Sequence, residues 1–66
     1  VGASFVDNVL QLSEEANVSV YSAAGAKVYA KQNVRSVNLA QLPASLYIIC
    51  IEKDGKQNLY KYNGKR

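Results

Sequence analysis

The side chains that could carry out chemistry are few in this chain of 66 residues. It has one cysteine, Cys50, and no histidine. A nucleophilic thiol needs a neighbouring base, and imidazole is not available here to act as one. A structural zinc site needs about four Cys or His ligands, so the composition excludes a site of that kind. Cys50 lies in an apolar run, where we expect a small buried hydrophobic residue.

The carboxylates do not form a catalytic pair either. Glu14 and Glu15 are adjacent, and neighbouring residues of an extended chain project to opposite sides. They lie in a polar stretch, so a solvated turn is the better interpretation. Asp54 is accounted for by the tight turn that it forms with Gly55. We therefore expect no catalytic residue, no metal site and no cofactor.

Basic residues gather at the end of the chain. The net charge is +3, and Lys56, Lys61, Lys65 and Arg66 all follow the last acidic residue, Asp54. Charges of one sign can steer docking to an acidic surface of a partner. The alternative is a solvated strand face and tail that protect a sheet edge from aggregation. The residues alone favour this second interpretation.

Tyrosines among lysines are a pattern of proteins that bind single-stranded nucleic acid, where bases stack on exposed aromatic rings. Tyr29 between Lys27 and Lys31 is one such triplet. Triplets of this kind are common on half-exposed strands, so we expect neither nucleic acid nor a small-molecule ligand.

The segments that must position these residues are short, alternating and rich in β-branched and aromatic residues, which favours strands. One domain of this size buries only about 60% of its unfolded surface and has no disulfide, so its stability must come from an apolar core, a partner chain or a larger parent protein. About six strands are expected, covering residues 5–12 (with a bulge or break at 7–8), 17–22, 26–31, 34–39, 46–53 and 56 onward. A polar connection is expected at 13–16, a turn at 23–25 and a break at 42–45.

Alternation predicts which side chains face the core. Val18 and Val20 share one face, and Val37 and Leu39 are expected to point inward. In residues 26–31, the alanines and valine fall on one face and the lysines and tyrosine on the other, so the alanine and valine face is expected to cover the core. Residues 46–53 are apolar on both faces, which predicts a central position in the sheet.

The Asp54-Gly55 pair is the strongest local signal, because this composition favours a two-residue type I′ hairpin loop. The loop fixes the register of the two flanking strands. The predicted cross-strand pairs are Lys53 with Lys56, Ile51 with Asn58, Cys50 with Leu59, Ile49 with Tyr60, Ile48 with Lys61, and Tyr47 with Tyr62. The predicted fold is an all-β antiparallel sandwich or barrel of six to seven short strands that ends in this hairpin.

Three blocks of the sequence together resemble a known family. Residues 17–28 are similar to a V-x-V-Y-[polar]-x-x-G-[small]-x-V segment, and residues 37–48 to a hydrophobic-[DN]-L-x-x-L-P-x-G-h-Y-h segment. An apolar strand, an Asp-Gly turn and a last strand with spaced lysines follow. The residues that carry this likeness are Val18, Val20, Tyr21, Gly25, Leu42, Pro43, Tyr47, Asp54, Gly55, Lys61 and Lys65. The pattern resembles the type A C-terminal sorting domains of the type IX secretion system of Bacteroidota.

The resemblance implies a fold and a role. The fold would be a small immunoglobulin-like sandwich, and the role a signal that directs a larger secreted protein across the outer membrane. The implied partners are the secretion machinery, with Lys61 and Lys65 as recognition residues, and a sortase-like surface protease that removes the domain. The implied route runs through the periplasm to the cell surface or the medium. The alternative function is a spacer or adhesive module of an extracellular protein, with the same fold.

Two features depart from the family pattern. Ser45 stands where the family usually has glycine, and the Pro-Asn-Pro segment that often opens the domain is absent. Either the first strand diverges or the chain, which starts at Val1 and is expected to be a piece of a longer protein, begins inside the domain. A missing strand would leave an unpaired edge, which predicts that a homodimer can form through it.

Overall fold

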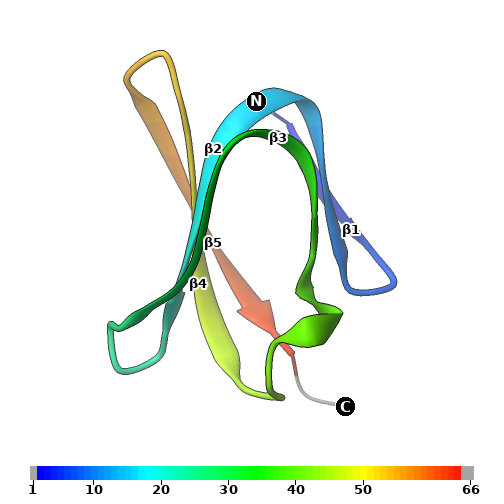
Figure 1. Cartoon of the computed structure of the whole chain (residues 1–66), viewed down its shortest axis with the longest axis vertical. Helices are drawn as coiled ribbons and strands as arrows, with labels where there is room; N and C mark the ends of the chain where they lie inside the picture. The colour runs from blue at the N-terminus through cyan, green and yellow to red at the C-terminus, as the bar shows by residue number, and fades with distance from the viewer. Residues whose placement is uncertain (1, 65–66) are drawn as a thin grey trace.

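The chain folds as an antiparallel sheet that is bent back on itself (Figure 1). The structure is a computed structural model that describes residues 2–64. Within this range there are five strands, one short 3-10 helix and no α-helix: β1 (Ala3–Val6), β2 (Val9–Ser22), β3 (Lys27–Asn38), η1 (Leu39–Gln41), β4 (Leu46–Lys53) and β5 (Lys56–Asn63). The all-β prediction is confirmed. Six to seven strands were expected. The number is five because the predicted first strand is divided between β1 and β2, its second part merges with the predicted strand 17–22, and the predicted strands 26–31 and 34–39 merge into β3.

The other strands are arranged around β2, the longest strand. β3 pairs along one edge of β2. The other edge is divided, since residues 9–12 pair with β1 and residues 17–22 pair with β4. β5 pairs with the far edge of β4, which gives the order β1-β2-β4-β5 with β3 on the other side of β2. The predicted central position of residues 46–53 is therefore confirmed.

β2 and β3 rise and descend together as an arch (Figure 1). Gln11 pairs with Ser36, and Ala16 pairs with Val34, so residues 12–15 of β2 lie opposite a single residue of β3. Extra residues on one strand of a pair bend that strand. β2 therefore follows the longer, outer path, and the sheet closes into two facing limbs.

The bend lies where the sequence predicted a polar connection at residues 13–16, and that prediction is wrong. These residues belong to β2. Ser13, Glu14 and Glu15 are exposed on the outside of the bend, whereas Ala16 is buried in the core. Two basic side chains satisfy the bend's carbonyls, because Arg35 Nη2 donates to Ser13 O at 3.3 Å and Lys53 Nζ donates to Glu15 O at 3.0 Å.

The core lies between the two limbs of the arch. Val18 and Val20 face inward as predicted, and so do Val37 and Leu39. The buried apolar residues of the described range come from β2, β3, η1 and β4, and they are Leu10, Leu12, Ala16, Val18, Val20, Val37, Leu39, Tyr47, Ile49 and Ile51. Full burial of each large aliphatic side chain stabilises the fold by about 1.5–3 kcal/mol.

The predicted inward face of residues 26–31 is wrong. Tyr29 packs against the core, while Val28 is 45% exposed. The reason is the register, because Tyr29 pairs with the buried Val20 and shares its face. The next pair is Tyr21 with Lys27, so Val28 is an extra residue that shifts the alternation.

The predicted strand over residues 5–12 is broken at residues 7–8, which is one of the two outcomes expected there. β1 and β2 form a hairpin in which Phe5 pairs with Leu10 and Val6 with Val9. Asp7 and Asn8 form the two-residue loop with φ values of 50° and 68°. Positive φ at both central residues is the geometry of a type I′ turn, and short polar side chains tolerate it best after glycine.

The Asp54-Gly55 hairpin is confirmed with all of its predicted cross-strand pairs. The end of this hairpin away from its loop contacts the β1–β2 hairpin and so connects the two limbs of the arch. The Tyr62 ring stacks on Phe5 of β1, with centroids 5.3 Å apart, and Tyr62 Oη donates to Asn8 Oδ1 at 2.8 Å. The two limbs thus face each other as in a sandwich, and the immunoglobulin-like arrangement stays a prediction.

Candidate recognition surface

Some residues of the quoted motifs build the fold rather than a surface. Val18 and Val20 are core residues of β2. Gly25 adopts φ +89° in the turn between β2 and β3, and its N–H donates to Ser22 O at 2.9 Å. A left-handed φ favours glycine, which explains Gly25 without a binding role. Asp54 and Gly55 have the same purpose, with φ values of 53° and 80°.

The Leu42-Pro43 pair and Tyr47 form a second structural group. Leu42 packs against the core from the end of η1. The Tyr47 ring is 4% exposed and stacks near Tyr62, and its hydroxyl donates to the carbonyl of Pro43. A buried tyrosine needs such a partner for its hydroxyl. These contacts hold the connection between β3 and β4 against the sheet.

Lys61 lies on the outer face of β5, which points away from the core. Its cross-strand neighbour on β4 is Ile48, as predicted. The Lys61 side chain is exposed, so its charge is available to a partner. Lys65 lies outside the described residues. Of the two recognition residues predicted from the sequence, the structure describes Lys61 and has it on the surface.

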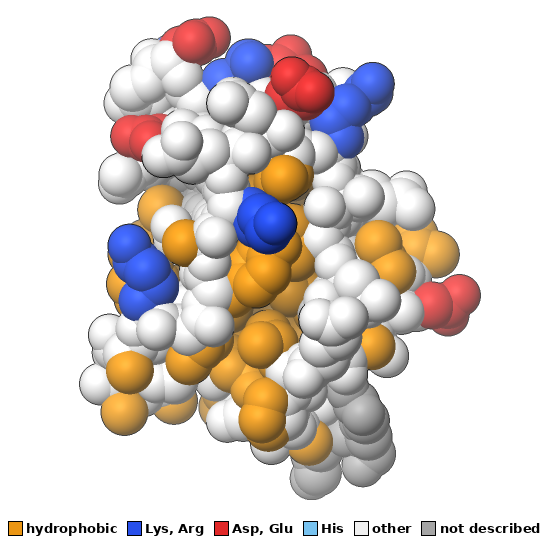
Figure 2. All heavy atoms as spheres, in the orientation of Figure 1, with side chains coloured by type: hydrophobic (Ala, Val, Ile, Leu, Met, Phe, Trp, Pro, Cys, Tyr) orange, Lys and Arg blue, Asp and Glu red, His pale blue; other side chains and the backbone are white. Residues whose placement is uncertain are grey.

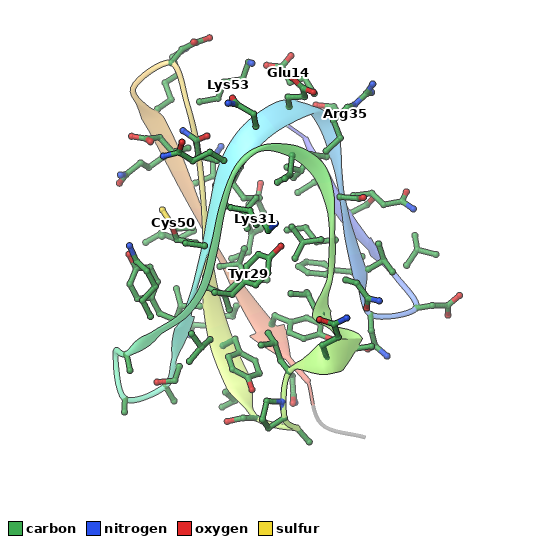
Figure 3. All side chains as sticks on the ribbon, in the orientation of Figure 1. Glu14, Tyr29, Lys31, Arg35, Cys50 and Lys53 are labelled. Atoms are coloured by element: carbon green, nitrogen blue, oxygen red, sulfur yellow. The ribbon has the colours of Figure 1, made fainter. Side chains whose placement is uncertain are left out.

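The outer face of β4 and β5 is unexpectedly apolar. Leu59 is 68% exposed and Leu46 is 55% exposed. Cys50 pairs with Leu59 as predicted, but it is only partly buried and points away from the arch (Figure 3), which corrects the prediction of a buried thiol. Leu46 and Ile48, together with Ala23 and Tyr47, border a hollow of about 220 Å³ beside Lys61. The signal was present in the sequence, since 46–53 is apolar on both faces and a two-limbed fold buries only one of them.

Tyr21 extends this surface across β2. Its pairing partners are Ile48 on β4 and Lys27 on β3, so the three side chains lie on the same face. Lys27 Nζ is 5.7 Å from the centre of the Tyr21 ring, which is within the range of a cation–π contact. Lys27 was not among the predicted recognition residues, because sequence spacing does not reveal which strands are neighbours.

The acidic side chains lie elsewhere. Asp7 is in the β1–β2 turn, Glu14 and Glu15 are at the bend, and Glu52 and Asp54 are at the hairpin end of β4. Figure 2 shows them at the top of the molecule and at one side. The end of the outer face that holds Leu46 and Lys61 is thus basic and apolar. In residues 2–64 no group of three or more Cys, Asp or Glu side chains is placed to hold a metal ion.

A comparison with protein families gives one match. The model described as the secretion system C-terminal sorting domain matches residues 6–62, which include β2, β3, β4 and β5 as far as Tyr62. The chain belongs to this family of sorting domains. No curated protein matches the chain significantly. The likeness to the type IX sorting domains inferred from the motifs is therefore confirmed.

Membership gives the sorting domain its general role. Domains of this family are the C-terminal sorting signals of the type IX secretion system, which implies contact with that machinery and export across the outer membrane. A sorting-signal domain is not itself catalytic. No helix within residues 2–64 is long and apolar enough to cross a membrane.

Proposed function

We propose that the sorting domain is the C-terminal domain of a larger secreted protein and that the secretion machinery reads it through β5 and its lysines. The domain folds in the periplasm, and its basic last strand directs the attached protein to the outer-membrane machinery. Lys61 and Lys65 are the recognition residues. A sortase-like protease on the cell surface then removes the domain.

The observation that carries this proposal is the family match, which includes β5 up to Tyr62. The exposure of Lys61 supports its role in recognition, because its ammonium group is accessible to a partner and does not pack in the core. The contrast with Tyr47 and Gly25 strengthens it, because packing and turn geometry account fully for those two motif residues.

An export assay tests the proposal. The chain is fused behind a neutral secreted reporter in a bacterium that has a type IX system, and reporter is measured in the periplasm, on the cell surface and in the medium. The doubly substituted K61A/K65A fusion should accumulate in the periplasm, because the recognition charges are gone while the core is intact. Deletion of residues 58–66 should also abolish export, but it removes most of β5 and so tests folding as well.

The matched control is Lys31→Ala, which removes an exposed lysine from the inner face of β3, away from the outer face that carries Lys61. We expect export of this variant at the wild-type level. Normal export of the K61A/K65A fusion would contradict the recognition role. Normal export after deletion of residues 58–66 would contradict the whole proposal in favour of a spacer module.

A further inference from the structure

Three strands have an edge that no other strand of the described range covers: β1, β3 and β5. An open edge presents unpaired N–H and C=O groups that another extended chain can pair with. The three edges differ in how well they could do so. β1 has four residues, which is too short for a stable ladder.

The β3 edge is protected. Its pairing with β2 shifts register in three places, and Asn33 in its middle has a φ of 56°. Lys31 pairs with the buried Val18, so it lies on the inner face of the sheet with its side chain exposed (Figure 3), and Arg35 follows at the bend. Bulges and charges directed inward are devices that prevent strand addition.

The β5 edge has none of these interruptions. Its eight residues pair with β4 in continuous register. The N–H of Gly64 donates to Ser45 O at 2.8 Å, which shows that even-numbered residues of this segment form the ladder bonds with β4. Successive residues of an antiparallel strand alternate in this respect. The backbone groups of Gln57, Leu59 and Lys61 therefore point to the open side.

The same three residues also present their side chains on the outer face. Leu59 is the most exposed large hydrophobic residue of the described range, at 68%. Lys61 lies two residues further along β5, on the same face. An added strand would thus meet an apolar side chain followed by a positive one, and cross-strand neighbours of matching type stabilise a sheet by about 0.2–1 kcal/mol per pair.

We propose that the open edge of β5 accepts an extended acidic and apolar segment of a partner protein as an additional antiparallel strand. In such strand addition, main-chain hydrogen bonds supply affinity and alternate side chains supply selectivity. The inference builds on the proposed function, because it names how that partner reads β5. A second copy of this chain is a poorer occupant, since β5 carries Lys56 and Lys61 and no carboxylate, so two copies would bring positive strands together.

A titration of the isotopically labelled 66-residue chain tests the proposal. The probe is a blocked eight-residue peptide, Glu-Glu-Val-Val-Glu-Glu-Val-Val, in which glutamate and valine alternate along each face of the strand, and the control peptide has lysine in place of glutamate. The amide signals of Gln57, Leu59 and Lys61 should shift and become protected from hydrogen exchange with the acidic probe. The basic peptide should bind at least about tenfold more weakly than the acidic peptide.

Two variants sharpen the test. Lys61→Glu should reverse the preference between the two peptides, because it reverses the charge beside the added strand. Lys31→Glu makes the same charge change at the β3 edge and should leave the preference unchanged. Both side chains are exposed, so both variants should keep the native circular dichroism spectrum, which is checked first.

Several results would overturn the proposal. They are equal binding of the two peptides, shifts that gather on β3, and no saturable binding at millimolar peptide. Protection of the same amides without peptide, together with a dimer in sedimentation, would make a second copy the occupant. The titration needs no secretion machinery, so its failure leaves the export result intact, and failed export leaves the titration result intact.

Discussion

The two tight hairpins of the sorting domain have the same loop geometry and different support. Asp7-Asn8 and Asp54-Gly55 both place two residues at positive φ. The β4–β5 hairpin is held by a long regular ladder of eight residue pairs. The β1–β2 hairpin has four pairs, and it depends on contacts with distant segments, since Asn8 O accepts from Leu39 N and Asn8 Oδ1 accepts from Tyr62 Oη. One hairpin is thus specified locally, and the other is stabilised by tertiary structure.

The largest difference between the hairpins should appear in the core. Ile49 of β4 is fully buried, whereas Phe5 of β1 is 40% exposed. Ile49→Ala should lower the free energy of unfolding by about 2–5 kcal/mol, and Phe5→Ala by about 1–2 kcal/mol because less of its surface is buried. Thermal and urea unfolding measure both values.

A domain of this size has a total stability of only about 3–10 kcal/mol, so Ile49→Ala will leave little folded protein. The milder Ile49→Val variant keeps the comparison measurable, with an expected loss of about 0.5–1.5 kcal/mol. Equal losses for Ile49→Ala and Phe5→Ala would show that the two hairpins contribute to the core alike.

The second prediction concerns the loop of the local hairpin. Gly55→Ala should destabilise the domain by about 1–2 kcal/mol, because φ +80° is strained for a side chain with a Cβ. The space around Gly55 is open, so a steric clash adds nothing to this cost. Urea unfolding measures the effect. No loss of stability would mean that the loop relaxes and that Asp-Gly does not fix the register.

The contrast between a locally specified hairpin and one stabilised by tertiary contacts also explains how much of the fold could be predicted from the sequence. The Asp54-Gly55 loop and the alternation around it fixed every pair between β4 and β5, because both signals are local. At Asp7-Asn8 the sequence indicated only a bulge or break and not a tight turn, because the turn is stabilised by Leu39 and Tyr62, which are far away in the sequence. Asparagine at a second turn position is a weaker signal than glycine.

The candidate surface was only partly predictable for a similar reason. Lys61 was found from the family pattern, and its neighbour Ile48 from the register. The contribution of Tyr21 and Lys27 requires knowing that β2 lies between β3 and β4. The extra residue at Val28 also reversed the faces of β3, and no local pattern announces such a bulge.

The third prediction tests the link between the two hairpins. Tyr62→Phe removes the hydroxyl that donates to Asn8 and should cost about 0.5–1.5 kcal/mol. Asn8→Ala should cost as much or somewhat more, because alanine tolerates the left-handed region less well than asparagine. The double variant should lose less than the sum of the two single variants, as a double-mutant cycle on unfolding free energies measures. Strict additivity would show that the bond contributes no stability.

The smallest effect is expected at the exposed ion pair between the bend and the β4–β5 hairpin. Lys53 Nζ lies 3.8 Å from Glu14 Oε1, and the two side chains are 34% and 54% exposed. Glu14→Gln should change the free energy of unfolding by less than about 0.5 kcal/mol, because solvent screens such pairs. Measurement at low and high salt checks this. A loss above 1 kcal/mol would indicate that the pair helps to hold the bend.

The divided edge of β2 also bears on the order in which the domain folds. Within residues 2–64 three of the four ladders join strands that follow each other in sequence, and only β2 with β4 joins strands that do not. Closing such a distant pair costs chain entropy before any contact repays it. The β1–β2–β3 unit is complete once residue 38 is available, so it can form first as a template. Docking of the β4–β5 hairpin onto residues 17–22 is then expected to be the slow step.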